Sequence, residues 1–298
     1  MSFPLKIYLE THRREVDGAL RRLFLSLKSC PPVHRKAMAY SVSAGGKRLR
    51  PILCLAASET VGLPRPSALR FACALELIHT YSLIHDDLPA LDDDDLRRGR
   101  PTNHKVFGEA QAVLAGDGLL TLAFEWATDP EAHGNKVRSH LGTAIHALAR
   151  AAGWFGMVGG QVDDILAEGK KPTLEKVLSI HRRKTGALLT VSVVLPALAA
   201  GKSDKVVRAL ESYGRNAGLA FQIVDDVLNE TSDAKTLGKA VGSDRSRGKM
   251  TYPAVCGLDA SRREIMRLTR AAVAALEPLG RRAEPLRALA EHMASRSA

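Results

Sequence analysis

Helix-length segments alternate along the chain with short breaks rich in proline and glycine, and this alternation constrains the fold more than any other feature. The breaks lie at residues 31–32, 62–66, 129–134, 168–172 and 201–204. Between them, apolar residues recur at intervals of three and four, as at Phe71, Leu75 and Ile78, which is the spacing of a buried helix face. No strand-turn-strand pattern competes with this reading. We therefore expect an all-α fold, a helical bundle.

The length and composition suit one large core. The chain has 298 residues, of which 45% are hydrophobic, and it contains no composition shift or fixed-period repeat. Length alone also allows two domains, but we expect a single domain over residues 1–298. The apolar run at residues 185–201 contains Pro196 and falls short of the roughly 20 residues that span a bilayer, so it predicts a buried core helix and no membrane insertion.

The net charge indicates an anionic partner. A formal charge of +11 and a pI near 9.7 fit nucleic acid, a membrane surface or a phosphorylated small molecule. The basic residues are spread without a basic tail, and aromatics are only 5% of the chain, so nucleic acid is disfavoured. Four dispersed cysteines and the lack of an apolar leader at the N-terminus favour a reducing, cytoplasmic location.

An acidic run follows the helical segment at residues 71–85. It contains Asp86, Asp87 and residues 92–95, all aspartates, with Pro89 between the two groups. Negative charge at a helix C-terminus opposes the macrodipole, so this arrangement is either a solvated acidic helix end or a metal site. Clustered carboxylates suit magnesium, which commonly bridges one or two of them to substrate phosphates.

A second polar group interrupts the apolar helical run that begins at Leu219. On a helix, Gln222, Asp225 and Asn229 share one face, and Asp226 adjoins it. Such a stripe is either solvated or functional. Two adjacent carboxylates among apolar neighbours are costly to bury alone, which implies a cation or a basic partner.

Three basic groups accompany the acidic ones, at residues 45–51, 97–99 and 182–185. Each alone is typical of a solvated surface or of helix capping. Together with acidic metal sites they indicate diphosphate binding. Magnesium neutralises only part of the negative charge of a diphosphate, and arginine and lysine side chains neutralise the rest.

The order of these motifs resembles that of the trans-isoprenyl diphosphate synthases. The resemblance rests on residues 45–51, 86–99, 184–186 and 221–229, and residues 101–105 and 114–117 resemble the bacterial short-chain branch. It covers nearly the whole chain. It implies a helical bundle of the isoprenoid-synthase type with a central active-site cavity, and an enzyme that works as a homodimer.

The resemblance also implies roles for individual residues. About three magnesium ions are expected with the substrate diphosphate. Their ligands would be Asp86, Asp87, Asp92 and Asp225, where Asp225 and Asp226 begin the second aspartate motif. The catalytic set would be Asp86, Asp87, Lys184 and Asp225. The residues expected to hold the allylic diphosphate are Arg97, Lys184, Thr185, Gln222, Lys239 and Lys249. Those expected to hold isopentenyl diphosphate are Lys47, Arg50, His79 and Arg98.

Three of these positions also have simpler interpretations. Lys239 and Lys249 lie in a polar stretch, residues 232–249, that reads either as a surface loop or as a mobile lid. A lone histidine in an apolar helix is commonly a core residue. His79 nevertheless precedes Asp86 by seven residues, about two turns along one helix face.

The implied reaction is ionisation of an allylic diphosphate, attack by the double bond of isopentenyl diphosphate, and loss of a proton. Tyr81, next to the small Ser82, is the expected floor of the hydrocarbon pocket, which favours farnesyl diphosphate with geranylgeranyl diphosphate as the alternative. A class I terpene cyclase and a non-catalytic partner subunit are the rival functions. Asn229 stands where the second motif usually has aspartate, which predicts weaker metal binding there.

Overall fold

The structure, a computed structural model, describes residues 3–231 and 249–295. Its residues group into two compact units. The N-terminal unit comprises residues 6–55 and 64–134, and the C-terminal unit comprises residues 1–5, 56–63 and 135–298. Neither unit is one continuous stretch of chain, and the single domain expected over residues 1–298 remains a prediction.

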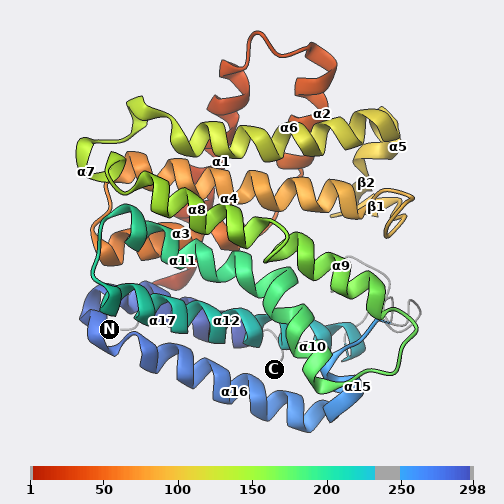
Figure 1. The fold of residues 1–298 in the computed structure, drawn as a ribbon, viewed down its shortest axis with the longest axis vertical. Helices are drawn as coiled ribbons and strands as arrows, with labels where there is room; N and C mark the ends of the chain where they lie inside the picture. The colour runs from red at the N-terminus through yellow and green to blue at the C-terminus, as the bar shows by residue number, and fades with distance from the viewer. Residues whose placement is uncertain (1–2, 232–248, 296–298) are drawn as a thin grey trace. The chain divides into compact units, whose positions relative to one another are not determined.

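The N-terminal unit is built around two long helices, α4 and α6, that lie side by side (Figure 1). Its elements are α1 (Leu5–Ser26), α2 (Pro32–Val42), the first part of α3 (Leu49–Val61), α4 (Arg65–Asp86), β1 (Leu96–Arg97), β2 (Arg100–Pro101), α5 (Asn103–Phe107), α6 (Glu109–Thr128) and η1 (Pro130–Ala132). Helix α4 packs on α6 and α2, and its buried residues occupy several faces. Gly116 of α6 lies against the His85 ring of α4, so closely that a side chain at position 116 would overlap the ring. This glycine lets the two helices approach closely.

The C-terminal unit is also helical. Its elements are α7 (Asn135–Arg138), α8 (Leu141–Ala152), α9 (Met157–Ala167), α10 (Leu174–Ile180), η2 (His181–Gly186), α11 (Ala187–Ala199), α12 (Asp204–Thr231), α15 (Tyr252–Cys256), α16 (Leu258–Ala275), η3 (Glu277–Ala283) and α17 (Glu284–Ser295). Helix α12 contacts α11, α16 and α17. The Tyr213 hydroxyl of α12 donates to the Leu286 carbonyl of α17 at 2.7 Å, which ties two of these helices together inside the core.

The predicted all-α class is confirmed, since helices form almost all regular structure in the described residues. The predicted core helix at residues 185–201 appears as α11, which is buried along most of its length and contains Pro196. No helix within residues 3–231 and 249–295 is both long and apolar enough to cross a membrane.

A small hairpin at residues 96–101 was not predicted from the sequence. Strands β1 and β2 pair antiparallel, with Arg97 opposite Arg100. The turn residues Arg98 and Gly99 both have positive φ, 55° and 74°, as type I′ turns require. A strand of two residues carries no alternating pattern, so the periodicity of the sequence could not reveal it.

Candidate active site

Helix α4 ends at the acidic run, and the chain then folds back on itself. Asp87 caps the helix, and the Asp92 amide donates to the Asp86 carbonyl at 2.8 Å. Asp93 adopts a left-handed conformation, with φ of 49°. The fold-back brings the backbone of Asp92 against that of Asp86, and both residues are partly exposed. Asp86 and Asp92, six residues apart in the chain, are therefore neighbours along the backbone.

Asp87 differs from these two because it is buried. Its carboxylate lies 2.5 Å from the Arg97 guanidinium, which also contacts Asp94 at 3.1 Å. Burial alone would lower the pKa of Arg97, but Asp87 and the neighbouring carboxylates outweigh it and raise that pKa above its ordinary value. Arg97, expected to hold the allylic diphosphate, thus also neutralises a buried carboxylate of the acidic run.

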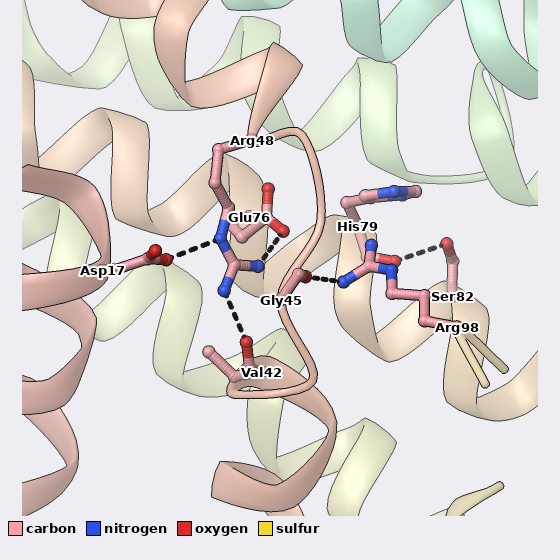
Figure 2. Close-up of polar contacts among 8 residues, drawn as sticks. All are labelled: Asp17, Val42, Gly45, Arg48, Glu76, His79, Ser82 and Arg98. Carbon is pink, nitrogen blue, oxygen red and sulfur yellow. Dashed lines mark hydrogen bonds and ion pairs between the residues drawn. The ribbon is translucent and has the colours of Figure 1, made fainter. Parts of the chain in front are cut away.

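The residues expected to bind isopentenyl diphosphate form a cationic group in the same unit. The pKa of His79 is held well below its ordinary value by burial and then by Arg50 and Arg98, so its imidazole is neutral at pH 7. Figure 2 shows the His79 ring next to the Arg98 guanidinium. Lys47 is exposed in the loop that precedes Arg50. Cations this close repel one another, which an anion would relieve.

Tyr81, the expected floor of the hydrocarbon pocket, is buried, with 5% of its surface exposed. Its ring meets that of His85 edge to face at 5.8 Å between centroids. Burial and the charge of Asp86 raise the pKa of its phenol to about 12. The neighbouring Ser82 hydroxyl donates to the His79 carbonyl at 2.9 Å, so it is occupied within its own helix. Tyr81 thus lies close to the acidic end of α4.

The C-terminal unit contains a separate polar cavity of about 120 Å³. It brings together four residues that the sequence assigns to the allylic diphosphate: Lys184, Thr185, Gln222 and Lys249. Asp164 of α9 also lines it and accepts a hydrogen bond from the Lys184 ammonium group at 2.7 Å. Lys184 and Thr185 belong to η2, a π-helical segment, and such segments are frequent at functional sites.

Asp226 of the second aspartate motif points into this cavity and has protein partners. One carboxylate oxygen accepts the Tyr252 amide at 2.8 Å and lies 3.2 Å from His181 Nε2. Both His181 and Asp226 are buried. Asp226 therefore joins α12 to η2 and to the start of α15. Asp225, the predicted metal ligand, does not line the cavity, although Gln222 does.

Asp164 and His181 were not predicted from the sequence as residues of the site. The glycine pair Gly159 and Gly160, which precedes Asp164 on α9, could have indicated a close contact between helices here. A side chain at Gly160 would overlap the Lys184 backbone. The neighbouring Asp163 pairs with Lys176 at 3.0 Å and with Arg183 at 2.5 Å, which leaves Asp164 for the cavity. A glycine pair followed by an acidic pair indicates a close helix contact next to a charged site.

The acidic side chains fit magnesium in part. Asp86 and Asp92 have carboxylate oxygens, the ligands this ion prefers, and their backbones are joined by a hydrogen bond. Within residues 3–231 and 249–295, no three His, Cys, Asp or Glu side chains converge to form a metal site by themselves. Magnesium commonly takes one or two protein carboxylates and completes its shell with water and substrate phosphates, so the acidic run suffices only together with a diphosphate.

The predicted site residues thus fall into two groups. The N-terminal unit holds Lys47, Arg50, His79, Tyr81, Ser82, Asp86, Asp87, Asp92, Arg97 and Arg98. The C-terminal unit holds Lys184, Thr185, Gln222, Asp225 and Lys249. Lys239, with most of the predicted loop or lid, lies outside the described residues.

Fold, acidic run and cationic residues together define a trans-prenyltransferase. The family model for polyprenyl synthetase matches residues 31–277. The chain belongs to the polyprenyl synthetase family.

Two curated relatives and one solved structure illustrate the similarity. The chain is 49% identical to a farnesyl diphosphate synthase of Geobacillus stearothermophilus over 260 residues, which is 87% of this chain and 86% of the relative. It is 45% identical to geranylgeranyl pyrophosphate synthase 11, chloroplastic, of Arabidopsis thaliana over 299 residues, covering 99% of this chain and 83% of the relative. The crystal structure of an FPP/GFPP synthase from Zymomonas mobilis superposes with a TM-score of 0.84 at 37% identity, over 98% and 99% of the two chains.

Proposed function

We propose that this enzyme condenses isopentenyl diphosphate with an allylic diphosphate, dimethylallyl or geranyl, and releases farnesyl diphosphate. The observation that carries the proposal is the cationic group around the neutral His79, in the same unit as the acidic end of α4. A cationic site and a carboxylate site in one unit suit two diphosphates, one bound by protein cations and one through magnesium.

The residues divide the work as follows. Lys47, Arg50 and Arg98 bind the diphosphate of isopentenyl diphosphate by charge, and neutral His79 supplies one N–H donor. Asp86 and Asp92, whose backbones meet, would hold magnesium for the allylic diphosphate, and Asp87 and Asp225 remain predicted ligands. Magnesium, when bound, stabilises the charge that develops on the departing diphosphate. Within the C-terminal unit, Lys184, Thr185, Gln222 and Lys249 line one polar cavity and offer donors for a diphosphate.

Ionisation of the allylic diphosphate breaks its C–O bond and leaves an allylic carbocation, which lasts long enough to react only in apolar surroundings. The cation reacts with the double bond of isopentenyl diphosphate, and the new intermediate loses a proton to the departing diphosphate. No side chain acts as a nucleophile. Water would quench the cation, so the proposed reaction requires apolar surroundings that exclude it.

Tyr81 favours the fifteen-carbon product. Its bulky ring is buried beside His85 and near Asp86, where a growing tail passing the acidic run would meet it. The alternative product is geranylgeranyl diphosphate, because the Arabidopsis relative is named as a geranylgeranyl pyrophosphate synthase. The two products differ in whether the tail stops at Tyr81 or passes it.

Product analysis tests the function directly. The purified chain is incubated with magnesium, isopentenyl diphosphate and each allylic primer in turn, and the products are identified by mass spectrometry. Farnesyl diphosphate as the main product supports the proposal. Geranylgeranyl diphosphate would leave the enzyme class intact and overturn the product. A hydrocarbon formed from one substrate indicates a terpene cyclase, and no turnover by the chain alone indicates a partner subunit.

The homodimer and the cytoplasmic location stay predictions. Light scattering after size-exclusion chromatography tests the first, and a monomeric mass at working concentration would contradict it.

A further inference from the structure

The loop that carries Lys47 and Arg50 has a conformation that few sequences tolerate. Gly45 and Gly46 have positive φ, 82° and 123°, and Arg48 also has positive φ, 50°. Left-handed backbone is unfavourable for a residue with a side chain, and it persists only where the surroundings impose it. Something must therefore hold Arg48 in place.

The Arg48 side chain supplies that restraint. It is buried, with 4% of its surface exposed, and every part of its guanidinium has a partner (Figure 2). It donates to Glu76 at 2.5 Å, to Asp17 at 2.8 Å and to the Val42 carbonyl at 2.6 Å. Burial would lower the pKa of Arg48, but Glu76 and Asp17 outweigh it and raise that pKa above its ordinary value.

Glu76 connects this loop to the helix of the site. It is 2% exposed and lies on α4 three residues before His79, one helical turn away. Arg48 stands between Lys47 and Arg50 in the chain. The ion pair between Arg48 and Glu76 thus fixes two residues of the proposed isopentenyl diphosphate site against the helix that carries a third.

A fourth residue of that site is held by the same loop. Arg98 donates to the Gly45 carbonyl (Figure 2), and a side chain at Gly46 would stand 2.7 Å from its guanidinium carbon. The position of the loop therefore decides where the Arg98 guanidinium rests. Moving the loop would displace Lys47, Arg50 and Arg98 together relative to His79.

From this geometry we infer that Arg48 and Glu76 are positioning residues, whose ion pair keeps Lys47, Arg50 and Arg98 arranged around His79 to receive one diphosphate. The inference rests on the proposed function. Neither side chain would touch the substrate, because both are buried in their mutual contact. Their effect would pass through the cationic residues, so it should fall on one substrate and spare the other.

The test compares the Michaelis constants of the two substrates. Glu76→Gln keeps the shape of the side chain and removes its charge, and Arg48→Lys keeps the charge and loses the three-way fork. For both variants we expect KM for isopentenyl diphosphate to rise about tenfold or more, while KM for geranyl diphosphate stays within about twofold. Glu76→Asp, which restores the charge, should recover part of the loss.

A stability control separates positioning from general destabilisation. Tyr213→Phe removes a buried hydrogen bond in the C-terminal unit and should lower the melting temperature without changing either KM. Where Glu76→Gln fails to fold, Asp17→Asn serves instead, because Asp17 is half-exposed and contributes one of the three Arg48 contacts. An equal rise of both KM values, or no change in the KM for isopentenyl diphosphate, would overturn the inference.

Amide hydrogen exchange makes the result independent of turnover. If Glu76→Gln releases the loop, the amides of residues 44–48 should exchange about tenfold faster or more, with the rest of α4 little changed. If the parent chain turns over neither substrate, the proposed function fails by itself, and this measurement alone decides the role of the ion pair. Unchanged exchange in residues 44–48 would overturn it.

Discussion

The carboxylate of Asp87 and the guanidinium of Arg97 lie 2.5 Å apart, both largely removed from water. Two aspartates that are adjacent in sequence therefore have different surroundings. Asp86 is partly exposed at the helix end, whereas Asp87 is committed to a buried ion pair. The pair joins the end of α4 to the hairpin that begins at Leu96.

This pair leads to a stability prediction. Arg97→Met removes a close cationic partner from the buried Asp87 carboxylate, so we expect the free energy of unfolding to fall by roughly 3 kcal/mol. The double variant Asp87→Leu/Arg97→Met should regain most of that loss, because the buried carboxylate is then absent as well. Urea denaturation measures both. A double variant as unstable as the single one would show that packing, and not the buried carboxylate, sets the cost.

Asp86 should matter for turnover more than for folding. We expect Asp86→Ala to reduce kcat by about a hundredfold or more with unchanged helical circular dichroism, because a metal ligand acts in the transition state. Asp95→Ala is the matched control, since Asp95 belongs to the same acidic run but is exposed and pairs with Lys105. Steady-state rates at saturating magnesium test this. If the two variants lose activity equally, the loss reflects the charge of the run and not one ligand.

Arg98 and Lys184 should affect different substrates. Arg98→Ala should raise KM for isopentenyl diphosphate about tenfold, and Lys184→Ala should do the same for the allylic diphosphate, since each removes one cation from one diphosphate. Each KM is measured with the other substrate saturating. The reverse pattern would mean that the two diphosphate sites are exchanged.

His79 predicts a pH dependence of stability. Its folded pKa is lowered, so below its unfolded pKa of about 6.5 the unfolded chain binds a proton that the folded chain does not. Stability should therefore fall as pH drops below about 6.5, by up to roughly 1.4 kcal/mol per pH unit from this group. Urea midpoints at pH 7 and pH 5.5 should differ more in the parent than in His79→Gln. If the urea midpoint changes by the same amount in the parent and in His79→Gln, the folded protein binds a proton at His79 as readily as the unfolded chain does, and the prediction fails.

Tyr81 predicts where chain growth stops. Tyr81→Ala should open space below the acidic run and shift products from fifteen to twenty carbons or beyond, since each buried CH₂ of the tail contributes roughly 0.8 kcal/mol. Tyr81→Phe is the control, because it keeps the ring and removes only the hydroxyl. Mass spectrometry of the products decides. A Tyr81→Ala enzyme that still stops at the parent length assigns the floor to other residues.

Local patterns in the sequence were enough to predict the all-α class, the helix breaks and the residue types proposed for the site. Helical periodicity and proline or glycine breaks act over a few residues, so a local pattern such as that of residues 71–85 reports them directly. The acidic and basic motifs could be identified because a diphosphate and its magnesium ions require those residue types. Their order along the chain then supplied the family resemblance.

Which charged residues meet became clear only in the folded protein. Arg48 and Glu76 are 28 positions apart, Asp164 and Lys184 are 20 apart, and His181 and Asp226 are more distant still along the chain. No local pattern links such pairs. Whether a carboxylate is partly exposed or half of a buried ion pair depends on what packs over it, and that is set by contacts between helices. For this reason Asp86 and Asp87 look alike in sequence and differ in the folded protein.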